Sequence, residues 1–416
     1  MKILLISVGT RGDMDPFINL ALLLKEKGHE VLCCFPDQFT SLAHDVGLNA
    51  FGLGAKFIDL LNSEAGKAAM GAEGPFYKKS IGIVKLAINQ NEANKELVFK
   101  QAEKIRDYSP DRIIYNGKSV YPIIWSIDNP GKAILLSPIP YMHKTKEHAH
   151  IGLNKDFGSF FNKLSYSLTD FGLVTTTRIS AKWLKLKPKP TKKKIREVLH
   201  TNKCLYTISP SLFRKPDDWG KHLHITGYLK NDLSNSNPLS DELNDFLNAH
   251  DKILFASFGS MINTDPEKKT KTLLSVLQKL NIPAVINIAS GGFAKPLEYD
   301  ESQFYFSNEV DYTKLFPRVY AVMHHGGSGT THLGLKYACP TLIIPHIIDQ
   351  FVWNKFTNKL GVGPLGFSIA KFNEQRLEEK LKDLWINENY ALEAQKISNK
   401  ILKEDFEERI LDIITI

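Results

Sequence analysis

The sequence predicts an α/β fold with two lobes, each built on a parallel sheet, and three features of the chain indicate it. Short segments rich in Val, Ile and Leu alternate with segments of helical periodicity in both halves. Residues 231–237, rich in Asn and Ser, favour turns and separate the halves. The length of 416 residues also favours two domains over one. We therefore expect two lobes that face a cleft.

The same patterns set the boundaries of these parts. The first lobe should span residues 1–230, a linker residues 231–250, and the second lobe residues 251–385. Residues 386–416 carry apolar side chains at roughly helical spacing. They predict one or two amphipathic helices that pack on a lobe or bridge the two.

The first lobe opens with a predicted βαβ unit. Lys2–Val8 and Glu30–Phe35 have the apolar composition of buried parallel strands. Between them, Asp15 followed by Pro16 predicts the N-cap and first position of a helix. Ligands of open parallel sheets bind outside the carboxyl ends of the strands, so the loop Gly9–Asp13 is a candidate ligand site.

Asp13 lies in this loop, and two interpretations of it stay open. A structural interpretation makes it a second helix cap or the partner of Arg11. Because Asp15 is the better predicted cap, Asp13 would otherwise project from the loop without a structural duty. The second interpretation is therefore a catalytic carboxylate.

The rest of the first half contains an irregular insertion and a second loop after a strand. Residues 52–94 are irregular and glycine-rich, as substrate loops on α/β scaffolds often are. Ser137–His143 directly follows the predicted strand Ala133–Leu136. Cys204–Ile208 predicts the last strand of this half.

The stretch Val322–Gln350 in the second half is built to hold phosphate oxygens. A strand there breaks into two histidines and two glycines, and Ser328–Thr331 then opens a helix. A helix start offers free N–H groups and partial positive charge, and glycines let the backbone approach a ligand. After the next strand, Asp349 and Gln350 form a second polar loop at the same sheet edge, within reach of another part of one ligand.

The composition is that of an ordinary globular protein, with 43% hydrophobic and 24% charged residues. No apolar run approaches the roughly 20 residues that span a bilayer. The apolar N-terminus lacks a small-residue cleavage site before Gly9–Asp13, so we interpret it as a strand rather than a signal peptide. The four cysteines lack metal-ligand spacing and predict reduced thiols in a cytoplasm.

The net charge of +8 is unevenly distributed, since residues 182–196 hold eight Lys and Arg and no acid. This segment is either a solvated loop or a contact for anionic lipid headgroups. Nucleic acid is a less favoured partner because no recognisable binding module accompanies the charge. The aromatic residues of Phe157–Phe171, next to it, fit a core, an apolar acceptor pocket or a membrane-facing patch.

Several phosphate chemistries are disfavoured. No P-loop pattern is present, and Gly9 and Gly12 do not complete a dinucleotide fingerprint. A diphosphate that carries a sugar fits both polar loops, because His325 can donate to the phosphate while Asp349 and Gln350 hydrogen-bond sugar hydroxyls. We expect no metal, since the helix N-terminus and His325 would neutralise the leaving diphosphate.

The chain carries five marker segments in order: GTRGDMDP at 9–16, YTISPSLFRKPDDWGKHLHITGYL at 206–229, FASFGS at 255–260, LFPRVYAVMHHGGSGTTHLGL at 315–335 and PHIIDQFVWNKF at 345–356. Together they resemble the family 1 glycosyltransferases of GT-B fold over nearly the whole length. The resemblance is strongest to the branch of sterol 3-β-glucosyltransferases and antibiotic glycosyltransferases. It implies two Rossmann-like domains, with the acceptor bound in the first and the nucleotide-sugar in the second.

The resemblance also implies site residues, each by its match to a family motif. Asp13 matches the acid taken to be the catalytic base. Ser260 matches a position beside the diphosphate, and Val310 matches the backbone position that reads the uracil edge. Asp349 and Gln350 match the pair that holds the sugar hydroxyls. The diphosphate loop is matched by His325, Gly327, Ser328, Gly329 and Thr330, and the candidate acceptor contacts are Arg11, Tyr141 and His143.

The sequence departs from the family pattern at two places. Leu333 stands where plant relatives place a ribose-binding glutamate, as in the bacterial and sterol branches. The PWTRT-like segment of the sterol enzymes reads Pro140–Thr145 here, with Tyr141 for Trp and Lys144 for Arg. The identity of the acceptor therefore stays open.

The resemblance implies an inverting, metal-independent transfer of a hexose, with glucose favoured, from a UDP-sugar to a hydroxyl of an apolar sterol, lipid, polyketide or phenolic acceptor. Such a UDP-dependent hexosyltransferase would need no cofactor and would work in the cytoplasm, with peripheral contact to an anionic membrane as one further hypothesis. Two alternatives stay open: a UDP-sugar epimerase, or a non-catalytic protein that binds sugar nucleotides or glycolipids. The sequence does not predict the oligomeric state.

Overall fold

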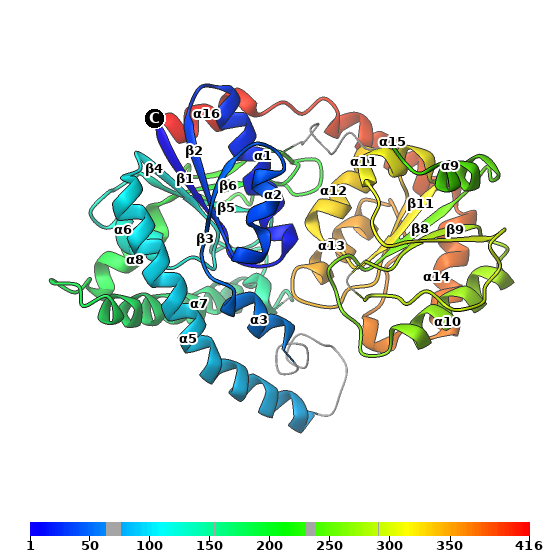
Figure 1. The fold of residues 1–416 in the computed structure, drawn as a ribbon, viewed down its shortest axis with the longest axis horizontal. Coiled ribbons are helices and arrows are strands. Elements are labelled where there is room, and N and C mark those ends of the chain that lie inside the picture. Colours follow the sequence, from blue (N-terminus) through cyan, green and yellow to red (C-terminus); the bar gives the residue numbers. More distant parts are fainter. Residues whose placement is uncertain (64–75, 154, 230–237, 290) are drawn as a thin grey trace.

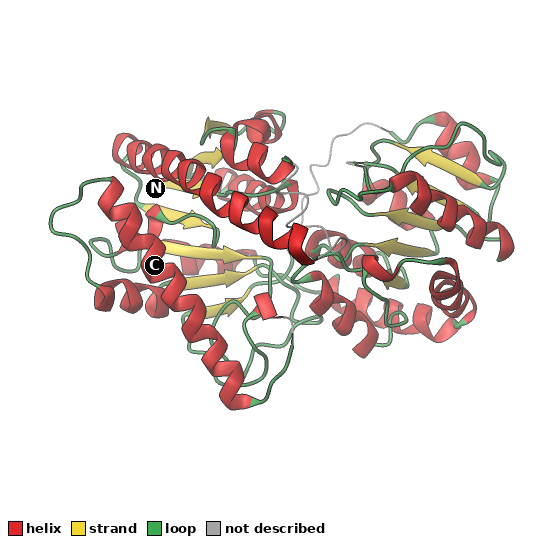
Figure 2. Ribbon diagram, turned by 90° about the horizontal axis from the view of Figure 1, so that it is seen from below, coloured by secondary structure: helices red, strands yellow, loops and turns green. Residues whose placement is uncertain are grey.

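The computed structural model describes residues 1–416 except 64–75, 154, 230–237 and 290. The described residues form two lobes, each around a parallel sheet covered by helices (Figures 1 and 2). The predicted two-lobed α/β fold is confirmed. In the described part of the chain, no helix has both the length and the apolar character needed to cross a membrane.

The N-terminal sheet has the strand order β3-β2-β1-β4-β5-β6-β7. Every neighbouring pair is parallel, and central β1 is fully buried from Ile3 to Ile6. Its apolar composition fits a strand that packs against helices on both faces. The strands are β1 (Lys2–Ile6), β2 (Glu30–Phe35), β3 (Asn49–Gly52), β4 (Arg112–Tyr115), β5 (Ala133–Ser137), β6 (Lys203–Tyr206) and β7 (Leu223–Ile225).

Strand β7 lies beyond the strand that we expected to be the last of this half. Its three residues are too few to show a periodicity in the sequence. The prediction that residues 52–94 are irregular was also wrong in part, because helices form near both ends of this range. The helices of this lobe are α1 (Arg11–Glu26), α2 (Thr40–His44), α3 (Lys56–Asn62), α5 (Phe76–Tyr108), α6 (Tyr121–Ser126), α7 (Ser159–Trp183) and α8 (Lys192–Thr201).

Helix α1 begins at Arg11, five residues before the predicted first position, Pro16. Thr10 is its N-cap, and the carboxylate of Asp13, three residues later, accepts the Thr10 N–H at 2.8 Å. This is a capping box, which satisfies helix donors that would otherwise lack partners. The prediction of Asp15 as the cap is therefore wrong: Thr10 and Asp13 were the stronger pair, and Pro16 lies inside the helix.

The C-terminal sheet has the order β10-β9-β8-β11-β12 and is also parallel throughout. Its strands are β8 (Leu254–Ser257), β9 (Ala284–Asn287), β10 (Phe304–Ser307), β11 (Ala321–His324) and β12 (Thr341–Ile343). The helices around it are α9 (Asp241–Asn248), α10 (Pro266–Lys279), α11 (Tyr312–Leu315), α12 (Ser328–Lys336), α13 (Gln350–Lys359) and α14 (Glu374–Ile386).

Residues 231–237 of the predicted linker lie outside the described residues. The second part of the predicted range folds as α9, whose Leu243, Phe246 and Leu247 pack into the C-terminal lobe. A linker between the lobes therefore ends before Asp241.

The two lobes share one apolar cluster. From the N-terminal lobe it contains Tyr206 and Trp219, and from the C-terminal lobe Leu335 and Trp353, all buried. Helix α15 (Glu388–Ile401) contributes Ile397 and other residues to the same cluster. Because this contact is apolar and well packed, it holds the lobes together more firmly than a polar interdomain contact would.

The chain ends on the N-terminal lobe. Helix α16 (Glu407–Thr415) lies over that lobe in Figure 1, and its Ile410 and Ile414 are buried in the N-terminal core. Arg112 donates to the carbonyls of Ile414 and Thr415 at 2.9 and 3.1 Å. A cation at a helix C-terminus satisfies its free carbonyls and its partial negative charge.

We expect Ile410→Ala to lower the free energy of unfolding by about 2–5 kcal/mol, because it opens a cavity under α16. Chemical denaturation followed by circular dichroism would measure the loss. Ile416→Ala, at a side chain that is 85% exposed, is the matched control and should change stability by less than about 0.5 kcal/mol. Equal effects of both substitutions would contradict the packing of α16.

Candidate functional site

The loops that follow the strands of the two sheets meet between the lobes. Arg11, after β1, donates to the carboxylate of Glu309, after β10, at 3.3 Å. Asp13, in the same first loop, lies close enough to Asp349, after β12, for its charge to raise the pKa of that carboxyl. The carboxyl ends of both sheets therefore face each other, which is where ligands of such folds bind.

The carboxylate of Asp13 is held from two directions. Besides the backbone N–H of Thr10, the Lys118 ammonium donates to both carboxylate oxygens, at 2.8 Å each. A side chain at Gly9, whose φ is +139°, would overlap both the Asp13 carboxylate and the Lys118 ammonium. The first glycine of the loop is thus needed to let these groups meet.

Lys118 was missed by the sequence analysis, and the structural interpretation of Asp13 named the wrong cation, Arg11. Lys118 follows β4, and Asn116 shapes its loop by donating to the carbonyl of Val8 at 2.7 Å. The sequence feature that could have identified Lys118 is its position just after β4, because β4 is a neighbour of β1 in the sheet. The pairing of two strands 110 residues apart is not visible in local sequence patterns.

Asp349 is the second acid of the site and differs from Asp13 in its surroundings. The pKa of Asp349 is raised to about 6, mainly by burial; the charge of Asp13 contributes to the rise, and the cation Lys118 opposes it. Its backbone carbonyl begins α13 by accepting the N–H groups of Val352 and Trp353. This carboxyl can therefore exchange a proton near neutral pH.

Gln350 already has a structural role in this loop. Its side-chain oxygen accepts the N–H groups of His346 and Ile347, at 2.7 and 3.1 Å. The amide nitrogen makes only a 3.5 Å contact with the sulfur of Met261. The Gln350 side chain was predicted to hold sugar hydroxyls. Among the described residues, its oxygen is already bonded, so its amide nitrogen is the atom that remains available to a sugar.

The imidazole of His325 is enclosed by two glycines of the C-terminal lobe. A Cβ at Gly259 would lie 2.8 Å from its Cε1, and one at Gly327 would lie 2.6 Å from its Nε2. Its Nδ1 is buried and has no hydrogen-bond partner among the described residues, which leaves it to a ligand. Burial lowers the pKa of His325 to about 4, so it would donate to a diphosphate as a neutral group and would not neutralise its charge.

The remaining predicted donor residues lie around the start of α12. Gly327 is its N-cap and offers no side chain, so the N–H groups of Ser328, Gly329 and Thr330 lack helical acceptors. A Cβ at the exposed Gly329 would meet only the hydroxyl of Tyr228, at 3.8 Å, so a ligand can approach there. Ser260 is exposed in the loop after β8, and Val310 is half-buried before α11.

The three predicted acceptor contacts do not gather around Asp13. Arg11 pairs with Glu309 across the lobes. Tyr141 stacks on His148 with ring centroids 4.5 Å apart. His143 lies 2.6 Å from the hydroxyl of Tyr206, within the shared aromatic cluster, and burial lowers its pKa to about 3. Its surroundings favour a core histidine.

His332, which the sequence analysis also missed, connects the lobes beside the site. Its Nε2 accepts the backbone N–H of Ser209 at 3.1 Å, so its Nδ1 carries the hydrogen and donates to the carbonyl of Ser328 at 2.7 Å. The ring stacks on Tyr228 of the first lobe with centroids 4.9 Å apart. The first turn of α12 is thereby fixed to the N-terminal lobe.

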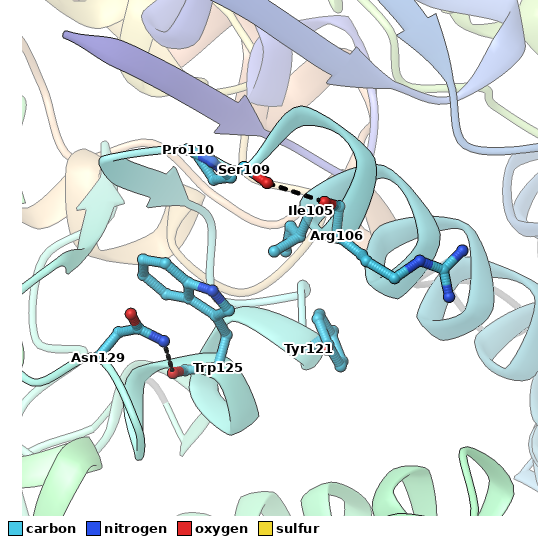
Figure 3. Close-up of a pocket in the computed structure, with 7 residues that line it drawn as sticks. All are labelled: Ile105, Arg106, Ser109, Pro110, Tyr121, Trp125 and Asn129. Atoms are coloured by element: carbon cyan, nitrogen blue, oxygen red, sulfur yellow. Dashed lines mark hydrogen bonds between the residues drawn. The ribbon is translucent and has the colours of Figure 1, made fainter.

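A hollow of about 310 Å³ lies elsewhere, near the amino end of β4 (Figure 3). Its polar groups bond within the chain, with Asn129 donating to the Trp125 carbonyl at 3.0 Å and Ser109 to the Arg106 carbonyl at 3.1 Å. We assign no ligand to it. The lining residues are Ile105, Arg106, Ser109, Pro110, Tyr121, Trp125 and Asn129.

Comparisons with known proteins find chains of similar sequence and fold. Residues 306–414 match the family model of the erythromycin biosynthesis protein CIII-like C-terminal domain. A sterol 3-beta-glucosyltransferase of Arabidopsis thaliana is 27% identical over 97% of this chain and 64% of its own length. One of Kluyveromyces lactis is 26% identical over 96% of this chain and 33% of its own length. The chain thus spans less than two thirds of these relatives.

Solved structures of similar fold cover almost the whole chain. The glycotransferase of kitacinnamycin has a TM-score of 0.73 at 16% identity and covers 99% of this chain and 98% of its own. The spinosyn rhamnosyltransferase SpnG complexed with thymidine diphosphate has a TM-score of 0.65 at 16% identity and covers 99% of both chains. The fold is therefore of the GT-B class. The resemblance of this chain to the family 1 glycosyltransferases, in the branch of the sterol and antibiotic enzymes, is confirmed.

The buried histidines predict loss of stability in acid. Burial holds the pKa of His325 and His332 at about 4, while imidazoles of the unfolded chain titrate near 6.5. The unfolded chain therefore binds more protons between these values, so stability falls as the pH drops from about 6.5 to 4. His143 and His346, with pKa values of about 3, act in the same direction, and Asp349, with its raised pKa, opposes them below about pH 6.

Denaturant midpoints measured at pH 7.5 and pH 5 would show this decrease. A midpoint that is equal or higher at pH 5 would contradict the neutral, buried state of these imidazoles.

Proposed function

We propose that this protein transfers a hexose, with glucose favoured, from a UDP-sugar to a hydroxyl of an apolar acceptor, with inversion at the anomeric carbon. The observation that carries the proposal is that the loop of Asp13 meets the C-terminal lobe, since Arg11 pairs with Glu309 and Asp13 lies near Asp349. That lobe also carries the free start of α12 and the Nδ1 of His325, which has no partner among the described residues. A base on one lobe and an anion site on the other fit a transfer between two substrates. The names of the similar sterol and antibiotic glycosyltransferases support it.

Asp13 is the proposed general base. The acceptor oxygen attacks the anomeric carbon from the face opposite the diphosphate while its proton passes to the Asp13 carboxylate. A C–O bond forms to the acceptor, the C–O bond to the diphosphate breaks, and UDP leaves with the bonding electrons. Base catalysis of this kind contributes on the order of 10² to 10⁴ in rate. Lys118 positions the carboxylate through both of its oxygens.

The C-terminal lobe is proposed to hold the donor without a metal ion. The N–H groups of Ser328, Gly329 and Thr330 and the partial positive charge at the start of α12 would receive the diphosphate. His325 adds one neutral donor, Asp349 and the Gln350 amide take the sugar hydroxyls, and Ser260 and Val310 flank the diphosphate and the uracil. We propose that the protein carries out this transfer in the cytoplasm.

We expect Asp13→Asn to lower acceptor-dependent UDP release at least about a hundredfold while the affinity for UDP stays unchanged. The measurement is UDP release from UDP-glucose in EDTA, with and without a pool of sterol, phenolic and lipid hydroxyl acceptors. Asp45→Asn, at an exposed acid of the same lobe, is the control. Full activity of Asp13→Asn would refute the base, and release that requires added Mg²⁺ would refute metal independence.

The same assay separates the alternatives. Epimerisation would change the donor sugar without an acceptor and without UDP release. A binding protein would retain UDP affinity with no turnover.

We expect His325→Ala to weaken UDP binding roughly three- to tenfold, because one neutral hydrogen bond to the diphosphate is lost. Uridine, which has no phosphate, should bind the variant and the wild type equally. Titration calorimetry would measure both ligands, with His44→Ala, at an exposed histidine, as the control. An equal loss of affinity for uridine and UDP would place His325 away from the phosphates.

A further inference from the structure

Helix α7 is turned the opposite way from an ordinary surface helix. Its buried side is largely polar or small and includes Asn162, Ser165, Thr177 and Ser180. Its large apolar side chains point to solvent instead, with Phe160 74%, Leu168 69% and Phe171 61% exposed. Surface helices normally bury the apolar stripe.

The exposed apolar residues form a continuous stripe. Phe160, Phe161, Leu164, Leu168 and Phe171 follow helical spacing on α7, Phe157 lies just before the helix, and all six are exposed. We call these six residues the apolar stripe. In Figure 1, α7 lies below α8, which it contacts, and α3 and α5 extend further down. A contiguous apolar surface of this kind marks a contact with another molecule or a membrane.

The polar side of α7 explains why the helix is turned this way. The Asn162 amide donates to the carbonyl of Lys146 at 2.9 Å, and the Ser165 hydroxyl accepts the N–H of His150 at 2.8 Å. The Tyr166 hydroxyl lies 3.2 Å from the carbonyl oxygens of Tyr141 and His148. These bonds tie α7 to the loop 141–150, so the stripe cannot turn inward without breaking them.

Basic side chains lie beside the stripe at Lys163 and, in larger number, beyond its C-terminal end. Lys163 and Arg178 are exposed on α7 itself, and Lys192, Lys193 and Lys194 are exposed at the start of the adjacent α8. The connecting residues 184–191 add further exposed lysines and no acid. Two acids lie nearer the stripe, but Asp170 pairs with His200 at 2.9 Å and Asp156 accepts from the Asn162 amide at 2.8 Å.

We infer that the apolar stripe and the lysines around it bind the surface of an anionic lipid bilayer. Phe and Leu side chains would enter the boundary between headgroups and acyl chains, while the lysines contact anionic headgroups. A second copy of the chain fits this surface less well. A second copy of the chain carries the same positive charge in this segment, whereas an anionic bilayer complements it.

The loop 141–150 belongs to the N-terminal lobe, which carries the proposed base. If the proposed function holds, a bilayer against α7 would present lipid hydroxyl acceptors to this lobe, next to the loop that the Tyr166 hydroxyl contacts at Tyr141. That step alone rests on the proposed transfer. Binding of the bilayer does not depend on it.

The test is co-sedimentation of the full chain with vesicles of phosphatidylcholine alone and of phosphatidylcholine with phosphatidylserine, at low and high salt. The wild type should bind the anionic vesicles at low salt and should be released by salt. We expect two variants to have an affinity for the anionic vesicles that is lower by roughly tenfold or more. They are the double variant Phe160→Ser/Leu168→Ser and the triple variant Lys192→Glu/Lys193→Glu/Lys194→Glu.

Matched controls lie on the C-terminal lobe. Leu297→Ser, at a fully exposed leucine, and Lys268→Glu/Lys271→Glu, at exposed lysines of α10, should bind vesicles as the wild type does. Every variant should have the circular dichroism spectrum and denaturant midpoint of the wild type, which shows that it is folded and keeps this test independent of the proposed function. The inference is overturned if the wild type ignores anionic vesicles at low salt, or if the stripe variants bind like the controls. A dimer in sedimentation velocity that Phe160→Ser/Leu168→Ser dissociates would also overturn it.

Discussion

The position of the site between the lobes depends on a contact through the imidazole of His332, together with the apolar cluster that the lobes share. This imidazole accepts a backbone N–H from the N-terminal lobe and donates to the first turn of α12 in the C-terminal lobe. Tyr228 stacks on one side of the ring, and Trp353 meets it edge-on at 5.2 Å. Because every polar atom of the ring is bonded, a change in its protonation would break a contact between lobes. The shared apolar cluster around Trp353 then sets how far the lobes can separate.

With the lobes fixed, parallel topology brings the charged groups together. Each strand delivers the loop at its carboxyl end to the same edge, so Asp13 and Lys118 meet although they lie on separate loops. The facing edge supplies Asp349 and the start of α12. The N-terminal edge thus carries a carboxylate with its ammonium partner, and the C-terminal edge carries a buried carboxyl beside free backbone N–H groups. These N–H groups suit the leaving diphosphate of the proposed transfer.

The sequence predicted what depends on neighbouring residues and missed what depends on distant ones. The composition of the strands predicted both parallel sheets, and the glycine-rich turn before Ser328 predicted the helix start with free N–H groups. Each of these signals is contained in a few consecutive residues. The roles of Lys118 and His332 arise from contacts 105 and 123 residues apart, which no local pattern shows. The start of α1 was a different kind of error. Two caps competed within six residues, and the carboxylate expected to be free became part of the capping box.

Helix α7 shows a further limit of periodicity. The spacing of four side chains predicts an amphipathic helix, namely that of Phe160, Leu164, Leu168 and Phe171. This spacing alone does not predict which face of the helix is buried in the fold. Here the hydrogen bonds of Asn162, Ser165 and Tyr166 decide it, since burying these groups without partners would cost more than exposing a stripe of aromatic and aliphatic side chains. The loop 141–150 therefore gains its support from the polar face. The apolar face stays available to a bilayer at the same time. One helix can therefore both support this loop and offer a contact surface.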